Sequence, residues 1–157
     1  MALLSDCMTV RDYEVTVTFE APIDYVYKWC TDYQEYDGKL RGASSTRNVV
    51  DRSKSRVVFI DHTNPGASDD KEKVRIITLK RNSWSLVGFD EGSNITGNYR
   101  LQSLGKNSTM LKLKYTLTYK TRKLVSKKEM AEEDTRDWNY YKAALERDYS
   151  SGKSPVG

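Results

Sequence analysis

The chain changes from a strand-like to a helix-like pattern within residues 13–32, which read YEVTVTFEAPIDYVYKWCTD. In 13–19, aromatic and β-branched residues alternate with polar ones, the two-residue period of a strand with one buried face. Pro22 fits the first turn of a helix, where its missing N–H is not needed. Apolar residues then recur at helical spacing from Ile23 to Cys30. We therefore expect a strand followed directly by a short helix.

Short strand-like runs separated by turn residues fill the middle of the chain. Before them, the polar and aromatic residues 32–36 predict a second short helix or a turn. The connections between the runs are short enough for hairpins, so the runs predict an antiparallel meander. The last run is the clearest, because Leu and Tyr alternate with Lys and Thr and so mark one buried and one solvent face. The expected strands are 44–51, 55–62, 72–80, 83–90, 95–104 and 109–121.

A long amphipathic helix is expected near the end of the chain. Ser126 and Glu129 have the spacing of a capping box, and acidic residues crowd the first turns, where the helix dipole favours anions. Apolar residues then recur every three or four positions as far as Tyr149, and Asp134 interrupts this stripe near its start. The helix therefore has one face suited to covering a sheet.

Length and composition favour a single domain. The chain has 157 residues, a size that supports one hydrophobic core, and it contains no internal repeat or linker. Its 26 basic and 22 acidic residues are mixed along the chain, which argues against a dedicated nucleic-acid-binding module. We expect one domain over residues 1–157, with an ordered core at about 12–149 and a flexible tail at about 150–157.

The sequence predicts no membrane segment, metal site or cofactor. Its apolar runs are too short for a membrane-spanning helix or a signal peptide, so we expect a cytoplasmic protein without integral membrane association. Cys7 and Cys30 lack the neighbours of a zinc site and are expected to be reduced thiols, with a disulfide between them as the alternative. His62 is the only imidazole and accompanies no nucleophile motif, which favours a solvated residue at a strand end.

This order of elements excludes a parallel sheet, because no crossover helix lies between the middle strands. It predicts an α+β fold in which a seven-stranded antiparallel sheet curves around the C-terminal helix, with one or two short helices after the first strand. A helix about 10 Å wide can leave a strongly curved sheet unfilled, so a cavity is expected between them. The residues expected to line it are Phe59, Trp84, Tyr99, Leu113, Tyr115, Tyr119, Trp138, Tyr141 and Leu145.

The element order and the segment FEAPIDYVYKWCTD at residues 19–32 resemble the START-like superfamily. This group is also called Bet v 1-like or SRPBCC and includes polyketide cyclases/dehydrases and lipid-transport proteins. The local match is an apolar strand, an Ala-Pro pair, Val26 followed by an aromatic residue, and Asp32 six positions on. The chain departs from the pattern at Tyr36, where many members carry Trp, and in the polar run 44–51. The resemblance implies a helix-grip fold with a hydrophobic ligand cavity, and it implies no particular reaction.

Three functions follow as alternatives, so whether the chain is an enzyme is left open. The first is binding of a hydrophobic small molecule or lipid in the cavity. The second is a polyketide cyclase/dehydratase-like enzyme acting in the same cavity, with Asp134 as its catalytic candidate against the simpler interpretation of a solvated helix carboxylate. The third is a protein-interaction module with a filled core, in which the basic run 120–128 would contact an acidic partner, a nucleic acid or an anionic membrane, against the simpler interpretation of a solvated junction between strand and helix.

Other polar residues could face the cavity, depending on strand register. Strand parity places Arg100 on the outer face, opposite to Tyr99, whereas Asp61 and Arg75 are undecided by one residue of register. The long strand edges could also pair two copies into a homodimer, although no feature of the sequence selects one edge.

Overall fold

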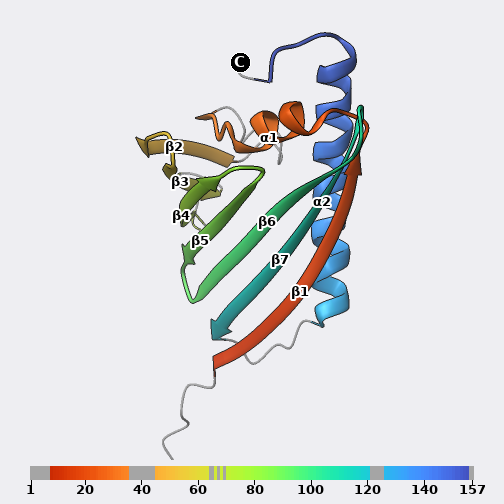
Figure 1. Cartoon of the computed structure of the whole chain (residues 1–157). Coiled ribbons are helices and arrows are strands. Elements are labelled where there is room, and N and C mark those ends of the chain that lie inside the picture. The colour runs from red at the N-terminus through yellow and green to blue at the C-terminus, as the bar shows by residue number, and fades with distance from the viewer. Residues whose placement is uncertain are drawn as a thin grey trace, which may run out of the picture.

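The computed structural model describes residues 8–35, 45–63, 66, 68, 70–120 and 126–155. Its elements are β1 (Met8–Phe19), α1 (Ile23–Thr31), β2 (Ser45–Arg52), β3 (Arg56–Thr63), β4 (Lys71–Lys80), β5 (Ser83–Asp90), β6 (Ser93–Gly105), β7 (Ser108–Lys120) and α2 (Lys127–Ser150). The strands form one antiparallel 7-stranded sheet in the order β1-β7-β6-β5-β4-β3-β2. The sheet bends around α2, which lies beside β1 and far from β2 (Figure 1). The expected α+β helix-grip fold is therefore confirmed.

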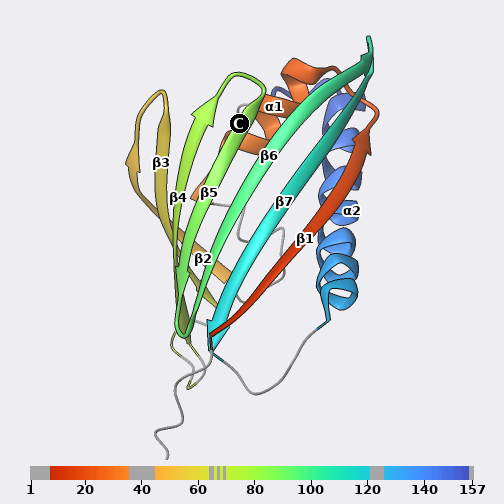
Figure 2. The same ribbon diagram turned by 60° about the horizontal axis from the view of Figure 1, so that its bottom comes forward.

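The strands match the expected runs closely, with one clear difference at the first strand. β1 begins at Met8 rather than at residue 13, because the register with β7 continues as far as Met8 opposite Lys120. Residues 32–35 form no α-helix, and the rest of the expected second helix, with Tyr36, lies outside the described residues. Figure 2 shows that consecutive strands from β2 to β7 lie next to one another, as a meander requires.

The core lies between the inner face of the sheet and the two helices, and it extends from β1, β7 and β6 to Val57 and Phe59 of β3. The inner residues of β1 and β7 alternate with exposed ones and are almost fully buried, as the two-residue period predicts. The turn from β1 to α1 is fixed by Thr109, whose buried hydroxyl donates a hydrogen bond to the Ala21 carbonyl at 2.8 Å. Residues of this core include Val15, Val17, Phe19, Ala21, Val26, Leu101, Leu111, Leu113 and Leu145.

The start of α2 is capped as the sequence indicates. The Ser126 Oγ accepts a hydrogen bond from the Glu129 N–H at 3.1 Å, which satisfies one of the free amide groups of the first turn. After α2 the chain turns back toward α1, where the Tyr25 hydroxyl donates to the Lys153 carbonyl at 2.9 Å. This return brings the segment after α2 to the same end of the sheet as α1.

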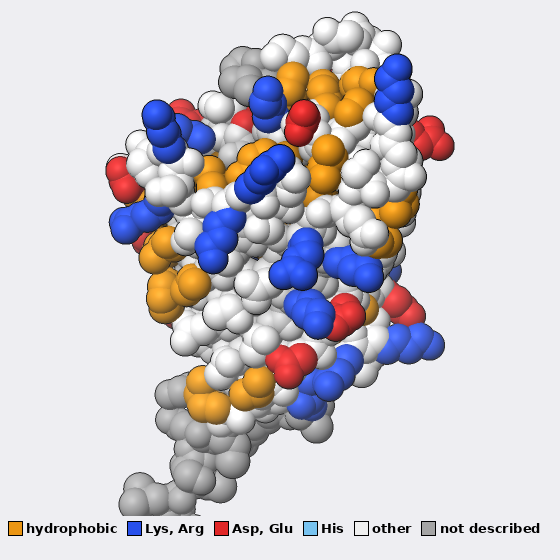
Figure 3. Space-filling model, viewed as in Figure 1, with side chains coloured by type: hydrophobic (Ala, Val, Ile, Leu, Met, Phe, Trp, Pro, Cys, Tyr) orange, Lys and Arg blue, Asp and Glu red, His pale blue; other side chains and the backbone are white. Residues whose placement is uncertain are grey.

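The outer face of the sheet is charged and exposed. Figure 3 shows basic side chains on this face with acidic and apolar groups among them. Lys114 of β7 pairs with Glu14 of β1 at 3.2 Å, and Arg100 is exposed here, as strand parity predicts. Of the basic run 120–128, residues 121–125 lie outside the described residues. Neither α1 nor α2 has the length and apolar composition to cross a membrane.

Candidate functional site

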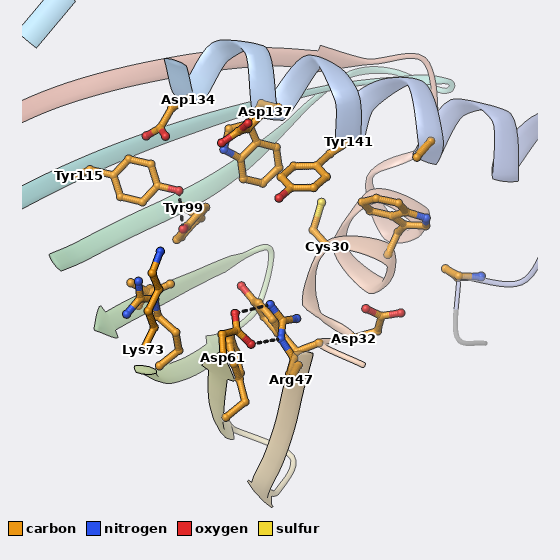
Figure 4. Close-up of a pocket in the computed structure, with 18 of the residues that line it drawn as sticks. Cys30, Asp32, Arg47, Asp61, Lys73, Tyr99, Tyr115, Asp134, Asp137 and Tyr141 are labelled. Atoms are coloured by element: carbon orange, nitrogen blue, oxygen red, sulfur yellow. Dashed lines mark hydrogen bonds and ion pairs between the residues drawn. The ribbon is translucent and has the colours of Figure 1, made fainter. Parts of the chain in front are cut away.

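A cavity of about 540 Å³ lies between the inner face of the sheet and the two helices. Small-molecule sites have volumes of roughly 300–1,000 Å³, so this one has room for a ligand. Side chains reach it from both helices, from every strand and from the segment that follows α2. The interior is thus not completely filled, which the interpretation as a module with a filled core would have required. Figure 4 shows Tyr141, Asp134 and Asp137 on the side of the cavity next to α2, and Arg47, Asp61 and Lys73 on the opposite side.

Aromatic rings form the part of the cavity next to α2. Trp138 and Tyr141 of α2 both line it, with their ring centroids 5.4 Å apart in an edge-to-face contact. Figure 4 shows Tyr141 pointing into it. Tyr99 of β6 faces them from the sheet, with its ring 6.2 Å from that of Trp138. Edge-to-face contacts of this kind are favourable for aromatic rings. The rings therefore hold one another in place and present a preformed apolar surface.

Two hydrogen bonds orient the phenol groups at this surface. The hydroxyls of Tyr99 and Tyr115 are 2.6 Å apart and buried. The Tyr13 hydroxyl donates to Asp134 Oδ2 of α2 at 2.6 Å. Burial raises the pKa of Tyr13, and the hydrogen bond and negative charge of Asp134 raise it further, so the phenol keeps its proton. This part of the cavity thus combines phenol hydroxyls with the Asp134 carboxylate.

A buried ion pair forms the opposite wall. Arg47 of β2 lies directly across from Asp61 of β3 in the register, and its guanidinium binds both carboxylate oxygens at 2.8 and 3.1 Å. The two side chains are only 5% and 8% exposed. The guanidinium also lies 4.1 Å above the centre of the Phe59 ring, and the Tyr33 ring stacks on Phe59. Bidentate geometry and the ring contact are what a desolvated arginine requires.

A second ion pair continues this wall along β4 and β5. Arg75 reaches Asp90, with Nη1 to Oδ1 at 2.5 Å and Nη2 to Oδ2 at 3.3 Å. The guanidinium lies flat on the sheet because Gly88 is below it: a Cβ on Gly88 would be 2.6 Å from Arg75 Nη1. Lys73, next on the inner face of β4, also lines the cavity. Arginine and lysine side chains thus reach the cavity from β2 (Arg47) and β4 (Lys73 and Arg75).

A second glycine keeps the cavity open below the tyrosines. Gly97 of β6 lies opposite Tyr115 of β7, and a Cβ on Gly97 would be 2.8 Å from Tyr115 Cε1. Real Cβ atoms do not approach other atoms so closely, so any larger residue would displace the ring. The absence of a side chain at Gly97 therefore lets the Tyr115 ring lie against the sheet instead of standing in the cavity.

The structure brings together most of the residues that the sequence predicted at the cavity. Phe59, Tyr99, Tyr115, Trp138 and Tyr141 line it, and so does the catalytic candidate Asp134. Trp84, Leu113, Tyr119 and Leu145 do not: they point inward but are covered by other side chains. Trp84, for example, lies under the Tyr99 ring, stacked at 4.9 Å. Strand alternation predicts which face of the sheet a side chain is on, but it does not predict which other side chains cover it.

The charged wall is the part that sequence reasoning missed. Asp61 and Arg75, whose direction was undecided, both face the cavity. Arg47 and Lys73 were not singled out, and Arg47 belongs to the polar run that departs from the family pattern. The available signal was the alternation of Lys73 and Arg75 with Val74 and Ile76 in β4, which becomes informative only when the register is known.

The cysteines and the histidine form no catalytic or metal site among the described residues. Cys30 lines the cavity, whereas Cys7 lies outside the described residues. His62 is partly exposed, with Nδ1 3.5 Å from Asp70 Oδ1, and is not part of the cavity. In the described part of the chain, no group of three His, Cys, Asp or Glu side chains could hold a metal ion.

Comparison with known proteins finds similarity at the level of the fold. No protein-family model and no curated protein sequence matches the chain. The Zhui aromatase/cyclase from Streptomyces sp. R1128 is 18% identical, with a TM-score of 0.71 over 92% of this chain and 99% of that one. Norcoclaurine synthase from Thalictrum flavum is 12% identical, with a TM-score of 0.66 over 94% and 90% of the two chains. A START superfamily protein from Mycobacterium smegmatis is 12% identical, with a TM-score of 0.62 over 92% and 97%.

Proposed function

We propose that this chain, which has the START-like, Bet v 1-like helix-grip fold, binds a hydrophobic small molecule or lipid between the sheet and α2. The observation that carries the proposal is the cavity of about 540 Å³ with aromatic rings on both its sheet and helix sides. Burial of apolar ligand surface contributes about 25 cal/mol for each Å². Rings that are already packed against one another lose little conformational entropy on binding, so a smaller entropic cost opposes this gain.

The arrangement of the walls favours a ligand with an apolar body and a polar end. Trp138, Tyr141 and Tyr99 would contact the apolar body. The wall of Arg47, Asp61 and Arg75 is polar, and its ion pairs are complete without a ligand. An apolar group placed against this wall would gain little, because charged groups lose hydration when they are covered. The ligand is therefore expected to lie with its rings or chain along α2.

The direct experiment is native mass spectrometry of the purified protein, followed by organic extraction and identification of any compound released. We expect a hydrophobic compound bound in a one-to-one ratio. Leu86→Trp should lose it, because Leu86 lines the cavity and a larger ring there occupies the ligand's space. Val87→Trp is the matched control, since Val87 is the next residue of β5 and faces the outside.

The contrary results are equally specific. A compound retained by Leu86→Trp and lost by Val87→Trp would place the ligand on the outer face. Protein that arrives empty and shows no thermal shift with a panel of fatty acids and polycyclic aromatic compounds would argue against ligand binding altogether.

A cyclase-like enzyme acting in the same cavity is the second candidate, favoured by the hydrogen bond between Tyr13 and Asp134. The Asp134 carboxylate could accept a proton from a bound substrate, while the neutral Tyr13 phenol orients that carboxylate. One structurally similar protein is named an aromatase/cyclase and another a synthase, which supports testing this chemistry here.

Turnover of the extracted compound, or of a linear polyketide analogue, distinguishes an enzyme from a binding protein. For an enzyme, Asp134→Asn should lower kcat by at least about 100-fold, the usual contribution of a general base, while binding measured by mass spectrometry persists. Tyr13→Phe should lower kcat less, because it removes only the orienting hydrogen bond. Equal turnover by the wild type and Asp134→Asn would exclude Asp134 as the base.

A further inference from the structure

The charges of the wall do not cancel, and the unbalanced one belongs to Lys73. Its cross-strand neighbours on the inner face are Asp61 of β3 and Asp90 of β5. Both carboxylates are already bound by arginines, Asp61 by Arg47 at 2.8 Å and Asp90 by Arg75 at 2.5 Å. Within the described part of the chain, Lys73 has no hydrogen bond or ion pair. The inner faces of β2 to β5 therefore carry one more positive than negative charge at the cavity.

The Lys73 amine is directed into the cavity rather than into bulk solvent. Figure 4 shows its side chain pointing from the strands toward the space below the helix, and the residue is half-buried among the cavity-lining residues. A lysine that serves only solubility extends into water on the outer face, as Lys112 does on β7. Holding an ammonium group in a partly desolvated place costs free energy unless an anion pairs with it.

The carboxylates on the helix side do not neutralise this charge. Asp134 is hydrogen-bonded by the Tyr13 hydroxyl at 2.6 Å on the α2 side of the cavity. Asp137 is exposed to solvent, where its field is screened. Asp32 and Asp148 also line the cavity, and Asp148 accepts a hydrogen bond from Trp29 Nε1 at 3.0 Å. None of these four carboxylates forms an ion pair with Lys73. The space between Lys73 and the helix is therefore open to an anionic group of a ligand.

We propose that the ligand is an acid, and that Lys73 binds its carboxylate or other anionic oxygen while the rings next to α2 hold its apolar body. This inference rests on the proposed function, because it names the class of ligand for the same cavity. It assigns a direction to the ligand: the acidic end lies toward β4, and the apolar end lies against Trp138 and Tyr141. The two arginines form the rest of this wall but keep their own carboxylates, so specificity for the acid depends on one side chain.

Two probes that differ only in charge test the inference. Anthracene-9-carboxylate and anthracen-9-ylmethanol share the same fluorescent ring system, and only the first is anionic at pH 7.5. Titration of the wild type should give a dissociation constant at least about 10-fold lower for the carboxylate, the effect expected for a hydrogen bond to a charged group. Lys73→Met should abolish this preference, and Lys73→Arg should keep most of it. Lys112→Met, which removes a lysine from the outer face, should behave as the wild type.

Each other outcome separates the inference from the function on which it rests. If both probes bind the wild type equally, or if Lys73→Met keeps the preference, the cavity binds ligands and the assignment to Lys73 is wrong. If neither probe binds, both proposals fail for aromatic ligands of this size. Circular dichroism and the thermal midpoint of each variant show whether it is folded, and Lys73→Arg gives a second reading should Lys73→Met be unstable.

Discussion

The strands beside α2 and the strands far from it use their inner faces differently. β1 and β7, the helix-covered strands, bury a row of apolar side chains such as Val15 and Leu113. β2, β3 and β4, the open strands, carry Arg47, Asp61 and Arg75 on this face at the cavity, and their buried apolar residues Val57, Phe59 and Ile77 lie on the same face. The figures place α2 over the first group and away from the second (Figures 1 and 2). The cavity lies at the border, where apolar packing gives way to ion pairs.

The comparison teaches how this fold keeps a cavity open. Apolar side chains in place of Arg47, Asp61 and Arg75 would drive collapse onto the helix, because burying them is favourable. Paired charges offer no such gain, and their side chains are held flat by partners on neighbouring strands. As a consequence, the stability of this wall depends on both ion pairs being complete.

The largest expected effect comes from a substitution that breaks the Arg47–Asp61 ion pair of the open strands. Arg47→Met leaves the Asp61 carboxylate buried without its partner, and loss of one member of a buried pair costs about 3–5 kcal/mol of unfolding free energy. Urea unfolding followed by circular dichroism measures it. The double variant Arg47→Met with Asp61→Leu should recover much of the loss. A cost below about 1 kcal/mol for the single variant would mean that the pair behaves as a surface ion pair.

The matching change on the covered side removes apolar packing. Leu145→Ala deletes a fully buried side chain of α2, and such truncations cost about 2–5 kcal/mol. The same urea titration checks it. Tyr140→Ala is the control, because Tyr140 is 56% exposed and surface changes usually alter stability by no more than about 0.5 kcal/mol. Equal effects of the two substitutions would contradict the assignment of Leu145 to the core.

A smaller effect is expected where the two regions meet. Gly97→Ala places a methyl group against the Tyr115 ring and should cost about 1–3 kcal/mol, as overpacking does. It should also weaken ligand binding, because the displaced ring enters the cavity. Gly105→Ala adds the same group at a position with no atom within 4 Å, and it should affect neither stability nor binding. Unchanged binding by Gly97→Ala would show that the ligand still fits when the Tyr115 ring is displaced from the sheet.

The smallest expected effect concerns pH. The raised pKa of Tyr13 means that the folded state keeps a proton that the unfolded state loses at about pH 10. Above that pH the unfolded state binds fewer protons, so the free energy of unfolding falls as pH rises, by at most about 1.4 kcal/mol per pH unit for one group. Tyr13→Phe should therefore show a shallower decline than the wild type between pH 9 and 11 (about one unit either side of the free phenol's pKa). Identical slopes would mean that Tyr13 ionises freely in the folded protein.

The fold could be predicted from the sequence because it depends on local patterns. The alternation in β7, the Ala-Pro step before α1 and the Ser126 cap each depend on neighbours within a few residues. The residues that line the cavity were harder to predict. Tyr99 and Trp84 are both inward aromatic residues, and only the stacking of one on the other decides which meets the ligand. The role of Arg47 could not be predicted, because its partner Asp61 lies opposite it in the strand register and not near it in the sequence.

The location of a bound ligand tests the central claim most directly. Two-dimensional ¹H–¹⁵N NMR spectra recorded during titration with anthracen-9-ylmethanol report which residues the compound contacts. We predict that shift changes concentrate at Leu86, Tyr99, Tyr115 and Trp138, which line the cavity, and that Phe89 and other residues of the outer face stay unchanged. Changes confined to the outer face, or a spectrum unaffected at saturating compound, would contradict the claim that this sheet and helix enclose a ligand site.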